Sequence, residues 1–280
     1  MLAIRLPEDI GITVRRALEE DVGSGDITAG LAPERLTANA VVISREPAIL
    51  CGTAWFDEVF RQLDTAVAVA WRFVDGDSLA PDQPVCTVAG PARSLLTGER
   101  TALNFLQLLS GTATTTRDYV KMLGGAKTRL LDTRKTLPGL RTAQKYAVAC
   151  GGGCNHRLGL YDAILIKENH IEAAGGISQA IRQAKSLNKS IEIEVENLDQ
   201  LQQAIAAGAD RIMLDNFSLE MISTAVHIAA GRTELEVSGG IEADSLRSLC
   251  GTGVDYISMG ALTKHVHAID YSMRIVTVKT

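Results

Sequence analysis

The sequence predicts an α/β fold in which a C-terminal β/α barrel, TIM-like in either a complete or an incomplete form, follows an N-terminal α+β sandwich domain. The barrel prediction rests on short apolar, β-prone runs that alternate with helix-like stretches after about residue 113. The runs lie at residues 128–132, 163–167, 191–195, 211–215, 234–238 and 256–260. The helix-like stretches between them include residues 178–186, 198–207, 219–229 and 244–249. This alternation is typical of βαβ units in a parallel sheet, and six units in succession favour a barrel over a doubly wound sheet.

The first 112 residues have a different pattern. Alternating apolar runs at residues 38–44, 66–73 and 84–89 are separated by turns rich in glycine, proline and aspartate. Helical periodicity is present at residues 8–20, 54–63 and 94–109. We therefore expect an α+β domain at 1–112 and the barrel at 113–264. The strand-like tail at 265–280 is expected to return to the first domain.

Composition argues against several classes of protein. The 280-residue chain is 46% apolar and 22% charged, which is typical of a globular protein with a sizeable core. Its net charge of −5 argues against binding to nucleic acids or anionic membranes. No apolar run is long enough to span a bilayer, and the N-terminus becomes acidic too early for a signal peptide. The five cysteines are odd in number and scattered, which favours reduced thiols and a cytoplasmic location.

Basic residues concentrate in one segment of this acidic chain. Eight basic and two acidic residues lie between Lys127 and Lys167. A local concentration of positive charge is what a small polyanionic ligand requires. The number of charges alone is equally consistent with a basic face exposed to solvent.

Chemically distinctive side chains follow the predicted barrel strands. In a β/α barrel the carboxyl ends of all strands open on one face, where active sites are built. The candidate residues at these junctions are Thr133, Arg134, Lys135, Lys167, Glu194, Asp215, Ser238, Gly239, Gly240, Met259, Gly260 and Ala261. We therefore expect one face that combines cations, carboxylates and glycine loops.

Two of these groups have a specific interpretation. The loops at 238–240 and 260–261 end the last two strands, where barrels commonly bind phosphate, and glycine lets backbone N–H groups approach phosphate oxygens. Ordinary turn geometry is the alternative. Glu194 and Asp215 end adjacent strands and would bind Mg²⁺ or stabilise a developing cation. An ion pair between Glu194 and Lys167 is the structural alternative.

Long, ordered motifs run through the chain. They are residues 26–28, 99–106, 110–114, 132–141, 145–148, 151–162, 166–170, 194–196, 214–216 and 237–241. Together they resemble the quinolinate phosphoribosyltransferase family over essentially the whole chain. The resemblance implies a reaction of NAD biosynthesis that joins quinolinate to 5-phosphoribosyl-1-pyrophosphate. Pyrophosphate and CO₂ are released, and nicotinate mononucleotide is formed.

The resemblance also implies how quinolinate is held. Arg134, His156 and Arg157 would clamp its two carboxylates, for which planar guanidinium groups are well suited. In the family, an arginine that matches Arg100 enters the site from the neighbouring subunit. This implies a homodimer whose active sites are shared between chains.

The catalytic positions implied by the resemblance are Lys135, Lys167, Glu194 and Asp215. The two lysines would hold pyrophosphate or carboxylates, and the two acidic residues would contact the ribose and Mg²⁺. The other substrate-binding positions are Thr133 and the 5-phosphate cradle of Ser238, Gly239, Gly240, Met259, Gly260 and Ala261. Positioning and electrostatics would dominate catalysis, so no residue is assigned to proton transfer.

Three alternatives stay open at this point. The paralogous molybdenum-transport-associated protein shares this fold and would lack part of the dicarboxylate clamp, whose residues are all present here. A phosphosugar aldolase or isomerase on the same barrel would use Lys167 to form a Schiff base. A binding protein would retain the phosphate loops without turnover, against which the carboxylate pair and the matched cations argue.

Overall fold

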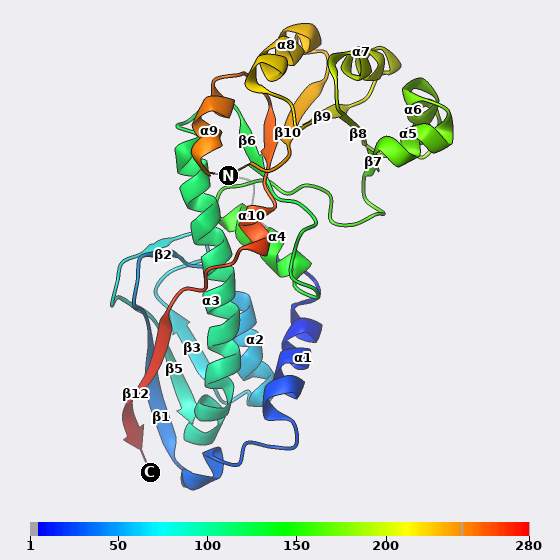
Figure 1. The fold of residues 1–280 in the computed structure, drawn as a ribbon. Helices are drawn as coiled ribbons and strands as arrows, with labels where there is room; N and C mark the ends of the chain where they lie inside the picture. Colours follow the sequence, from blue (N-terminus) through cyan, green and yellow to red (C-terminus); the bar gives the residue numbers. More distant parts are fainter. Residues whose placement is uncertain (1–4, 242, 280) are drawn as a thin grey trace. The chain divides into compact units, whose positions relative to one another are not determined.

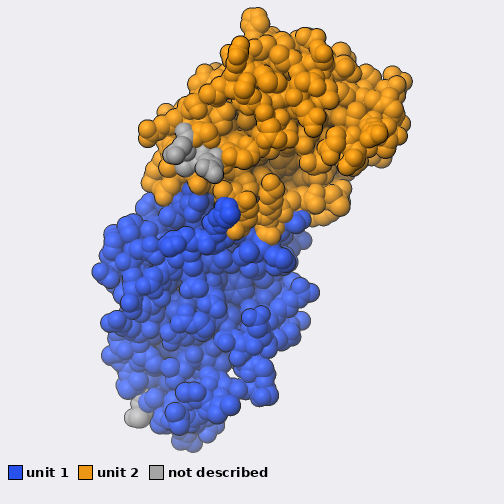
Figure 2. All heavy atoms as spheres, in the orientation of Figure 1, with its two compact units in different colours: residues 1–117, 137–152, 265–280 blue, residues 118–136, 153–264 orange. Residues whose placement is uncertain are grey.

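The computed structural model describes residues 5–241 and 243–279. The chain divides into two compact units, which Figure 2 draws in different colours. Unit 1 consists of residues 1–117, 137–152 and 265–280, and unit 2 consists of residues 118–136 and 153–264. Neither unit is therefore one continuous stretch of chain. The segment 137–152, which the sequence pattern assigned to the barrel, is grouped with unit 1.

Unit 1 is built around an antiparallel sheet with the strand order β12-β1-β5-β3. Its strands are β1 (Thr37–Ser44), β3 (Ala68–Trp71), β5 (Pro84–Pro91) and β12 (Tyr271–Lys279). A small second sheet pairs β2 (Ala48–Ile49) with β4 (Ser78–Leu79). The helices are α1 (Ile10–Val22), α2 (Thr53–Leu63), α3 (Ala92–Met122) and α4 (Arg141–Cys150), with a 3₁₀ turn at Ala29–Leu31. Strand β12, from the end of the chain, pairs antiparallel with β1 and forms an edge of this sheet (Figure 1).

The interior of unit 1 is apolar. Every second side chain of β1 is buried, as the alternation in its sequence predicts. Helix α2 contributes aromatic side chains, and the Phe56 ring lies 5.3 Å from Phe60 and 5.2 Å from Trp71 in edge-to-face geometry. Phe56 and Phe60 belong to one continuous cluster of buried apolar residues, and the half-buried Trp71 packs against it.

Helix α3 is longer than its sequence predicts. Helical periodicity covers residues 94–109, but the helix continues to Met122 through a run of serine, glycine and threonine. These residues have modest helix propensity, and tertiary packing outweighs it because several of them are buried. At Gly111 a side-chain Cβ would lie only 2.0 Å from the carbonyl oxygen of His267. The close approach of these two segments therefore requires glycine.

Unit 2 contains the parallel β/α part of the chain. Its six-stranded sheet has the order β6-β11-β10-β9-β8-β7, and every pairing in it is parallel. The strands are β6 (Arg129–Leu131), β7 (Ile164–Ile166), β8 (Ile191–Val195), β9 (Arg211–Asp215), β10 (Glu234–Ser238) and β11 (Tyr256–Ser258). The helices are α5 (Glu168–Ala174), α6 (Ile177–Lys185), α7 (Leu198–Ala207), α8 (Leu219–Ala229), α9 (Ala243–Cys250) and α10 (Ala261–Lys264).

The predicted α/β fold class is confirmed, and the parallel sheet corresponds to the incomplete form of the barrel. Strands β6 and β7 stand at the two ends of the strand order. Helices α6, α7 and α8 occur where the periodicity predicts them, whereas α4 and α5 were not predicted. Within the part of the chain that the structure describes, no helix is long and apolar enough to cross a membrane.

Candidate active site

The carboxyl edge of the parallel sheet gathers most of the predicted site residues. From β6 to β7, the residues that end or follow the strands are Thr133–Lys135, Met259–Ala261, Ser238–Gly240, Asp215, Glu194 and Lys167. Cations thus follow both end strands, and the strands between them end in carboxylates or lead into glycine loops. Because all pairings are parallel, these segments share one edge of the sheet.

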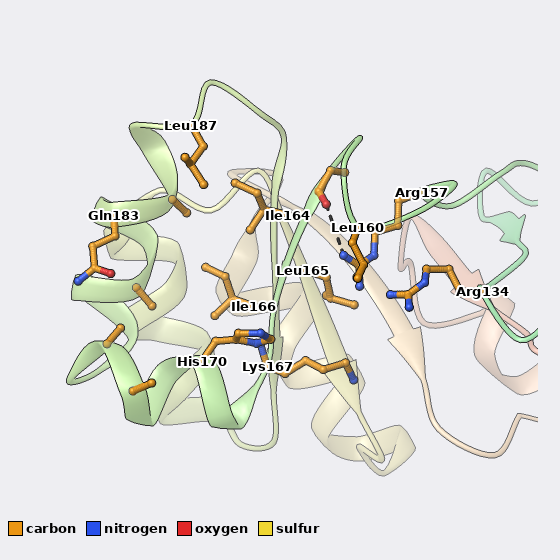
Figure 3. A pocket seen from close by; sticks show the side chains of 15 residues that line it. Arg134, Arg157, Leu160, Ile164, Leu165, Ile166, Lys167, His170, Gln183 and Leu187 are labelled. Carbon is orange, nitrogen blue, oxygen red and sulfur yellow. Dashed lines mark hydrogen bonds between the residues drawn. The ribbon is translucent and has the colours of Figure 1, made fainter.

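Three cations from separate segments line one cavity of about 760 Å³. They are Arg134 after β6, Arg157 in the connection between β6 and β7, and Lys167 after β7. Figure 3 shows the Arg134 side chain directed toward Arg157, with Lys167 on the same side of β7. Ile164 and Ile166 point to the opposite side of β7, toward α6 (Figure 3). The alternation along β7 therefore separates a cationic side from an apolar side.

The two arginines are electrostatically coupled. Burial, and then the nearby Arg134 guanidinium, lower the pKa of Arg157. The Arg157 guanidinium also donates a hydrogen bond of 3.4 Å to the carbonyl oxygen of Ala163. Two adjacent guanidinium groups repel each other, and a ligand with two anionic groups would relieve this repulsion.

Lys167 and Glu194 form an ion pair. The Nζ of Lys167 donates to Oε2 of Glu194 at 2.6 Å, with 46% and 13% of the two side chains exposed. The backbone N–H of Lys167 donates to Nδ1 of His170 at 3.0 Å, which fixes the first turn of α5. The structural alternative for Glu194 is therefore present. This pairing orients the lysine along the carboxyl edge, next to the strand that ends at Asp215.

The loops after β9 and β10 interlock. Gly239 has φ +102°, and a Cβ there would lie 2.3 Å from Oδ1 and 3.0 Å from the backbone nitrogen of Asn216. Asn216 also has a positive φ. Its backbone N–H donates to the carbonyl oxygen of Ser238 at 3.2 Å, and its side-chain amide donates to Oδ2 of Asp215 at 2.8 Å. Glycine at position 239 is thus required by both the backbone conformation and the close contact.

The loops after β6 and β11 are joined in a similar way. A Cβ at Gly260 would lie 2.9 Å from Cδ of Lys135. The Lys135 backbone N–H donates to Oγ1 of Thr133 at 3.0 Å, and its carbonyl accepts from Thr263 at 2.9 Å. Met259 is only 1% exposed. Its backbone N–H donates to the carbonyl oxygen of Leu131 at 2.9 Å, so Met259 joins the ends of β6 and β11.

His156 packs against two glutamates of the parallel sheet. Only 9% of its side chain is exposed, and its Nε2 is 2.9 Å from Oε2 of Glu192 and 3.7 Å from Oε2 of Glu236. Its Nδ1 accepts a hydrogen bond of 2.7 Å from the backbone N–H of Arg157. Both ring nitrogens thus lie close to groups of the protein. The ring also borders a smaller cavity of about 260 Å³, which Arg157, Glu192 and Arg211 line as well.

The inward side of the sheet carries a charged cluster that sequence reasoning missed. Barrel interiors are usually filled by branched aliphatic side chains, but here Glu192, Arg211 and Glu236 project inward. The Arg211 guanidinium lies 3.5 Å from Oε2 of Glu236, 3.0 Å from Oε2 of Glu234 and 4.0 Å from the Tyr256 ring centroid. Charged residues that alternate with Ile, Leu and Val in strands β8 and β10 were the available signal.

The two buried glutamates titrate differently. Burial, and then the charge of Glu192, raise the pKa of Glu236 well above its ordinary value. Burial also acts to raise the pKa of Glu192, but the hydrogen bond and charge of His156, followed by the charge of Arg211, lower it overall. The cluster therefore favours an ionised Glu192 beside a protonated Glu236.

Arg100 lies in unit 1, on α3, and its side chain is exposed. An exposed arginine in the middle of a helix is available to a second molecule.

These observations define a class of protein: a parallel β/α protein whose carboxyl strand ends combine clustered cations, a carboxylate pair and glycine loops suited to an anionic, phosphate-bearing ligand. Two family models match the chain. The model of the quinolinate phosphoribosyl transferase N-terminal domain matches residues 26–110, and that of the C-terminal domain matches residues 112–274. The chain therefore belongs to the quinolinate phosphoribosyl transferase family.

Individual relatives agree with this assignment. The chain is 44% identical over 259 residues to the probable nicotinate-nucleotide pyrophosphorylase [carboxylating] of Bacillus subtilis, covering 91% of this chain and 90% of that protein. It is 42% identical over 272 residues to the corresponding Mycobacterium leprae protein, covering 93% and 95%. The solved structure of the nicotinate-nucleotide pyrophosphorylase from Francisella tularensis has a TM-score of 0.94 and 53% identity, covering 97% of this chain and 98% of that chain.

Proposed function

We propose that this protein transfers the phosphoribosyl group of 5-phosphoribosyl-1-pyrophosphate to the ring nitrogen of quinolinate and decarboxylates the product to nicotinate mononucleotide. The observation that carries the proposal is that Arg134, Arg157 and Lys167 line one cavity beside the edge strand β7. Quinolinate bears two adjacent carboxylates, so it supplies the paired negative charge that two neighbouring guanidinium groups require. Family membership supports the same reaction.

The carboxylates at the strand ends would stabilise the reacting sugar. As the bond between ribose C1 and pyrophosphate breaks, positive charge develops on the ribose, and Glu194 and Asp215 lie on adjacent strands to oppose it. The ring nitrogen then bonds to C1. The alkylated ring accepts the electron pair released when the neighbouring carboxylate leaves as CO₂, and the ring carbon takes up a proton.

Mg²⁺ is the proposed cofactor. Glu194 and Asp215 offer the carboxylate oxygens that Mg²⁺ prefers, and it commonly completes its coordination with substrate oxygens and water. When bound, the ion would neutralise the pyrophosphate that leaves. Lys135 and Lys167 would share that task as compact positive charges.

The glycine loops would hold the 5-phosphate. Backbone N–H groups of Gly239, Gly240, Gly260 and Ala261, in the loops Ser238–Gly240 and Met259–Ala261, are the proposed donors, and Thr133 follows the neighbouring strand β6. The positive φ of Gly239 and Gly240 supports this role, because it turns successive peptide groups in directions that other residues rarely allow.

We further propose a cytoplasmic homodimer in which Arg100 of one subunit completes the site of the other. The exposed position of Arg100 and the exposed apolar side chains of Leu160 and Tyr161 support an interface. All five cysteines are free thiols, which supports a reducing compartment. Mixing Arg100→Ala and Lys167→Ala proteins should restore part of the activity after verified subunit exchange. No recovery would show that each site is built within one chain.

The reaction is tested by incubating the pure protein with quinolinate, 5-phosphoribosyl-1-pyrophosphate and Mg²⁺. Nicotinate mononucleotide is followed by ultraviolet absorbance and CO₂ is measured in parallel. Product that requires all three components, and that disappears with EDTA, is the expected result. No product, with the phosphoribosyl donor still bound, would contradict the assignment of quinolinate as acceptor. Borohydride trapping of Lys167 with a carbonyl substrate would instead indicate an aldolase.

A further inference from the structure

The buried charged cluster of unit 2 is connected to the cavity through His156. We propose that Glu192, which lies beside Glu236 and Arg211, is a positioning residue that acts through the His156 ring to fix Arg157, and so sets the affinity for the dicarboxylate ring. The inference rests on the proposed function, because it concerns how the same site selects its aromatic dianion.

The first link joins Glu192 to His156. Oε2 of Glu192 lies 2.9 Å from Nε2 of His156, and the two side chains are 8% and 9% exposed. Nδ1 of His156 accepts from a backbone N–H, so in the neutral ring the proton resides on Nε2. The protonated Nε2 therefore lies on the side of Glu192, within ion-pair distance of its carboxylate.

The second link joins His156 to Arg157. The backbone N–H of Arg157 donates to Nδ1 of His156 at 2.7 Å, and the backbone N–H of His156 donates to Oδ1 of Asp132 at 2.8 Å. The other oxygen of Asp132 accepts from Asn155 at 2.7 Å. The peptide groups on both sides of His156 are thus fixed. A shift of the ring would change the direction in which Arg157 enters the cavity.

The third observation concerns the groups around Glu192. Ligand atoms of His156, Glu192 and Glu236 lie within 4.8 Å of one another. Glu236 is 0% exposed on β10, and its carboxyl group lies 3.7 Å from the His156 ring and 3.5 Å from the Arg211 guanidinium. Glu192 on β8 and Arg211 on the neighbouring strand β9 are register partners. Burying such groups costs stability that aliphatic side chains would not. The cost is understandable if the cluster keeps a ligand-binding arginine in one orientation.

A metal site at the same place fits the geometry less well. His156, Glu192 and Glu236 each offer a ligand atom, and these atoms lie within 4.8 Å of one another. A metal at Nε2 would need a lone pair there and a proton on Nδ1. The Arg157 N–H already points at Nδ1, so this tautomer is disfavoured.

The test compares Glu192→Ala and Glu192→Gln with a matched control, Glu234→Gln. Glu234 belongs to the same sheet, and its carboxylate contacts Arg211 and Tyr256. In Glu192→Ala, we expect KM and the calorimetric Kd for quinolinate to rise about tenfold or more, which is the scale of one lost hydrogen bond to a charged group. KM for the phosphoribosyl donor should change by less than about twofold. Glu192→Gln keeps an acceptor and should recover most of the affinity, and Glu234→Gln should resemble the wild type.

A double-mutant cycle asks whether Glu192 acts through His156. His156→Asn retains an oxygen near the position of Nδ1 but cannot reach Glu192. We expect it to weaken quinolinate binding, and adding Glu192→Ala should cause no further loss. This comparison keeps the proposal testable if one single variant does not fold.

Several results would overturn the proposal. Equal rises in both KM values, a Glu192→Gln variant as weak as Glu192→Ala, or additive losses in the cycle would each contradict positioning through His156. Stoichiometric metal in the wild type that is lost in Glu192→Ala would identify a metal site instead. If the wild type makes no product yet binds quinolinate in a Glu192-dependent manner, the proposed reaction fails and the positioning role stands.

Discussion

The two units differ most in what fills them. Unit 1 packs its sheet and helices around one continuous apolar cluster that includes Trp55, Phe56 and Phe60. Unit 2 places apolar side chains such as Ile193 on one side of its strands, but the other side carries a histidine, glutamates and an arginine. Apolar burial stabilises a fold, whereas buried charge usually costs stability. We infer that the apolar core of unit 1 contributes mainly to the stability of the fold. The buried charges of unit 2 lower stability but keep the side chains of the proposed anion site in order.

The largest expected effect is on the stability of unit 1. Phe56 is fully buried and packs against two aromatic rings. Phe56→Ala should lower the free energy of unfolding by roughly 3–5 kcal/mol, the usual cost of removing a large core side chain. Denaturant unfolding measures this value. A loss below about 1 kcal/mol would contradict the role given to the aromatic cluster.

Arg134→Ala addresses the cationic side of unit 2. KM for quinolinate should rise roughly tenfold to a hundredfold, which corresponds to a lost hydrogen bond to a charged group. The unfolding midpoint and KM for the phosphoribosyl donor should change much less. Steady-state kinetics with each substrate varied in turn measures both constants, and equal losses for the two substrates would exclude the clamp.

Gly111→Ala tests a close contact within unit 1. The new Cβ would collide with the carbonyl oxygen of His267, so we expect a loss of about 1–3 kcal/mol in unfolding free energy from overpacking. KM values of the folded enzyme should stay near those of the wild type. Unchanged stability would show that the two segments separate readily.

Gly239→Ala is the matching substitution in unit 2. The positive φ and the contact with Asn216 predict a local strain of about 1 kcal/mol. We expect this strain to appear mainly as a higher KM for the phosphoribosyl donor, since the loop is the proposed phosphate cradle. A rise confined to quinolinate would argue that the cradle lies elsewhere.

Much of unit 2 could be predicted from its sequence, because local patterns mark where parallel strands end. Helices α7 and α8 have the predicted bounds. Helix α5 was missed because its first residues were interpreted only as a continuation of the strand-end motif. Residues 137–152 are grouped with unit 1 in the structure. The sequence pattern placed them in the barrel segment, because a sequence shows the order of the residues but not their long-range contacts.

For the candidate site, the sequence predicts which residues lie at the strand ends but not the directions of all their side chains. Topology alone places Lys167, Glu194 and Asp215 at successive strand ends. The direction of the His156 ring depends on Glu192 and Glu236, which come from strands far along the chain. No local sequence pattern determines such a tertiary contact. The same motif is therefore consistent with a histidine that binds the ligand and with one that positions a neighbouring ligand-binding residue.

The most direct test of the central claim, that paired arginines in unit 2 recognise two carboxylates, is a calorimetric comparison of two ligands. Quinolinate carries both carboxylates, and nicotinate carries one. The wild type should bind quinolinate at least about tenfold more tightly, and both Arg134→Ala and Arg157→Ala should reduce this ratio toward one. Equal affinities in the wild type, or a ratio that survives both substitutions, would contradict the claim.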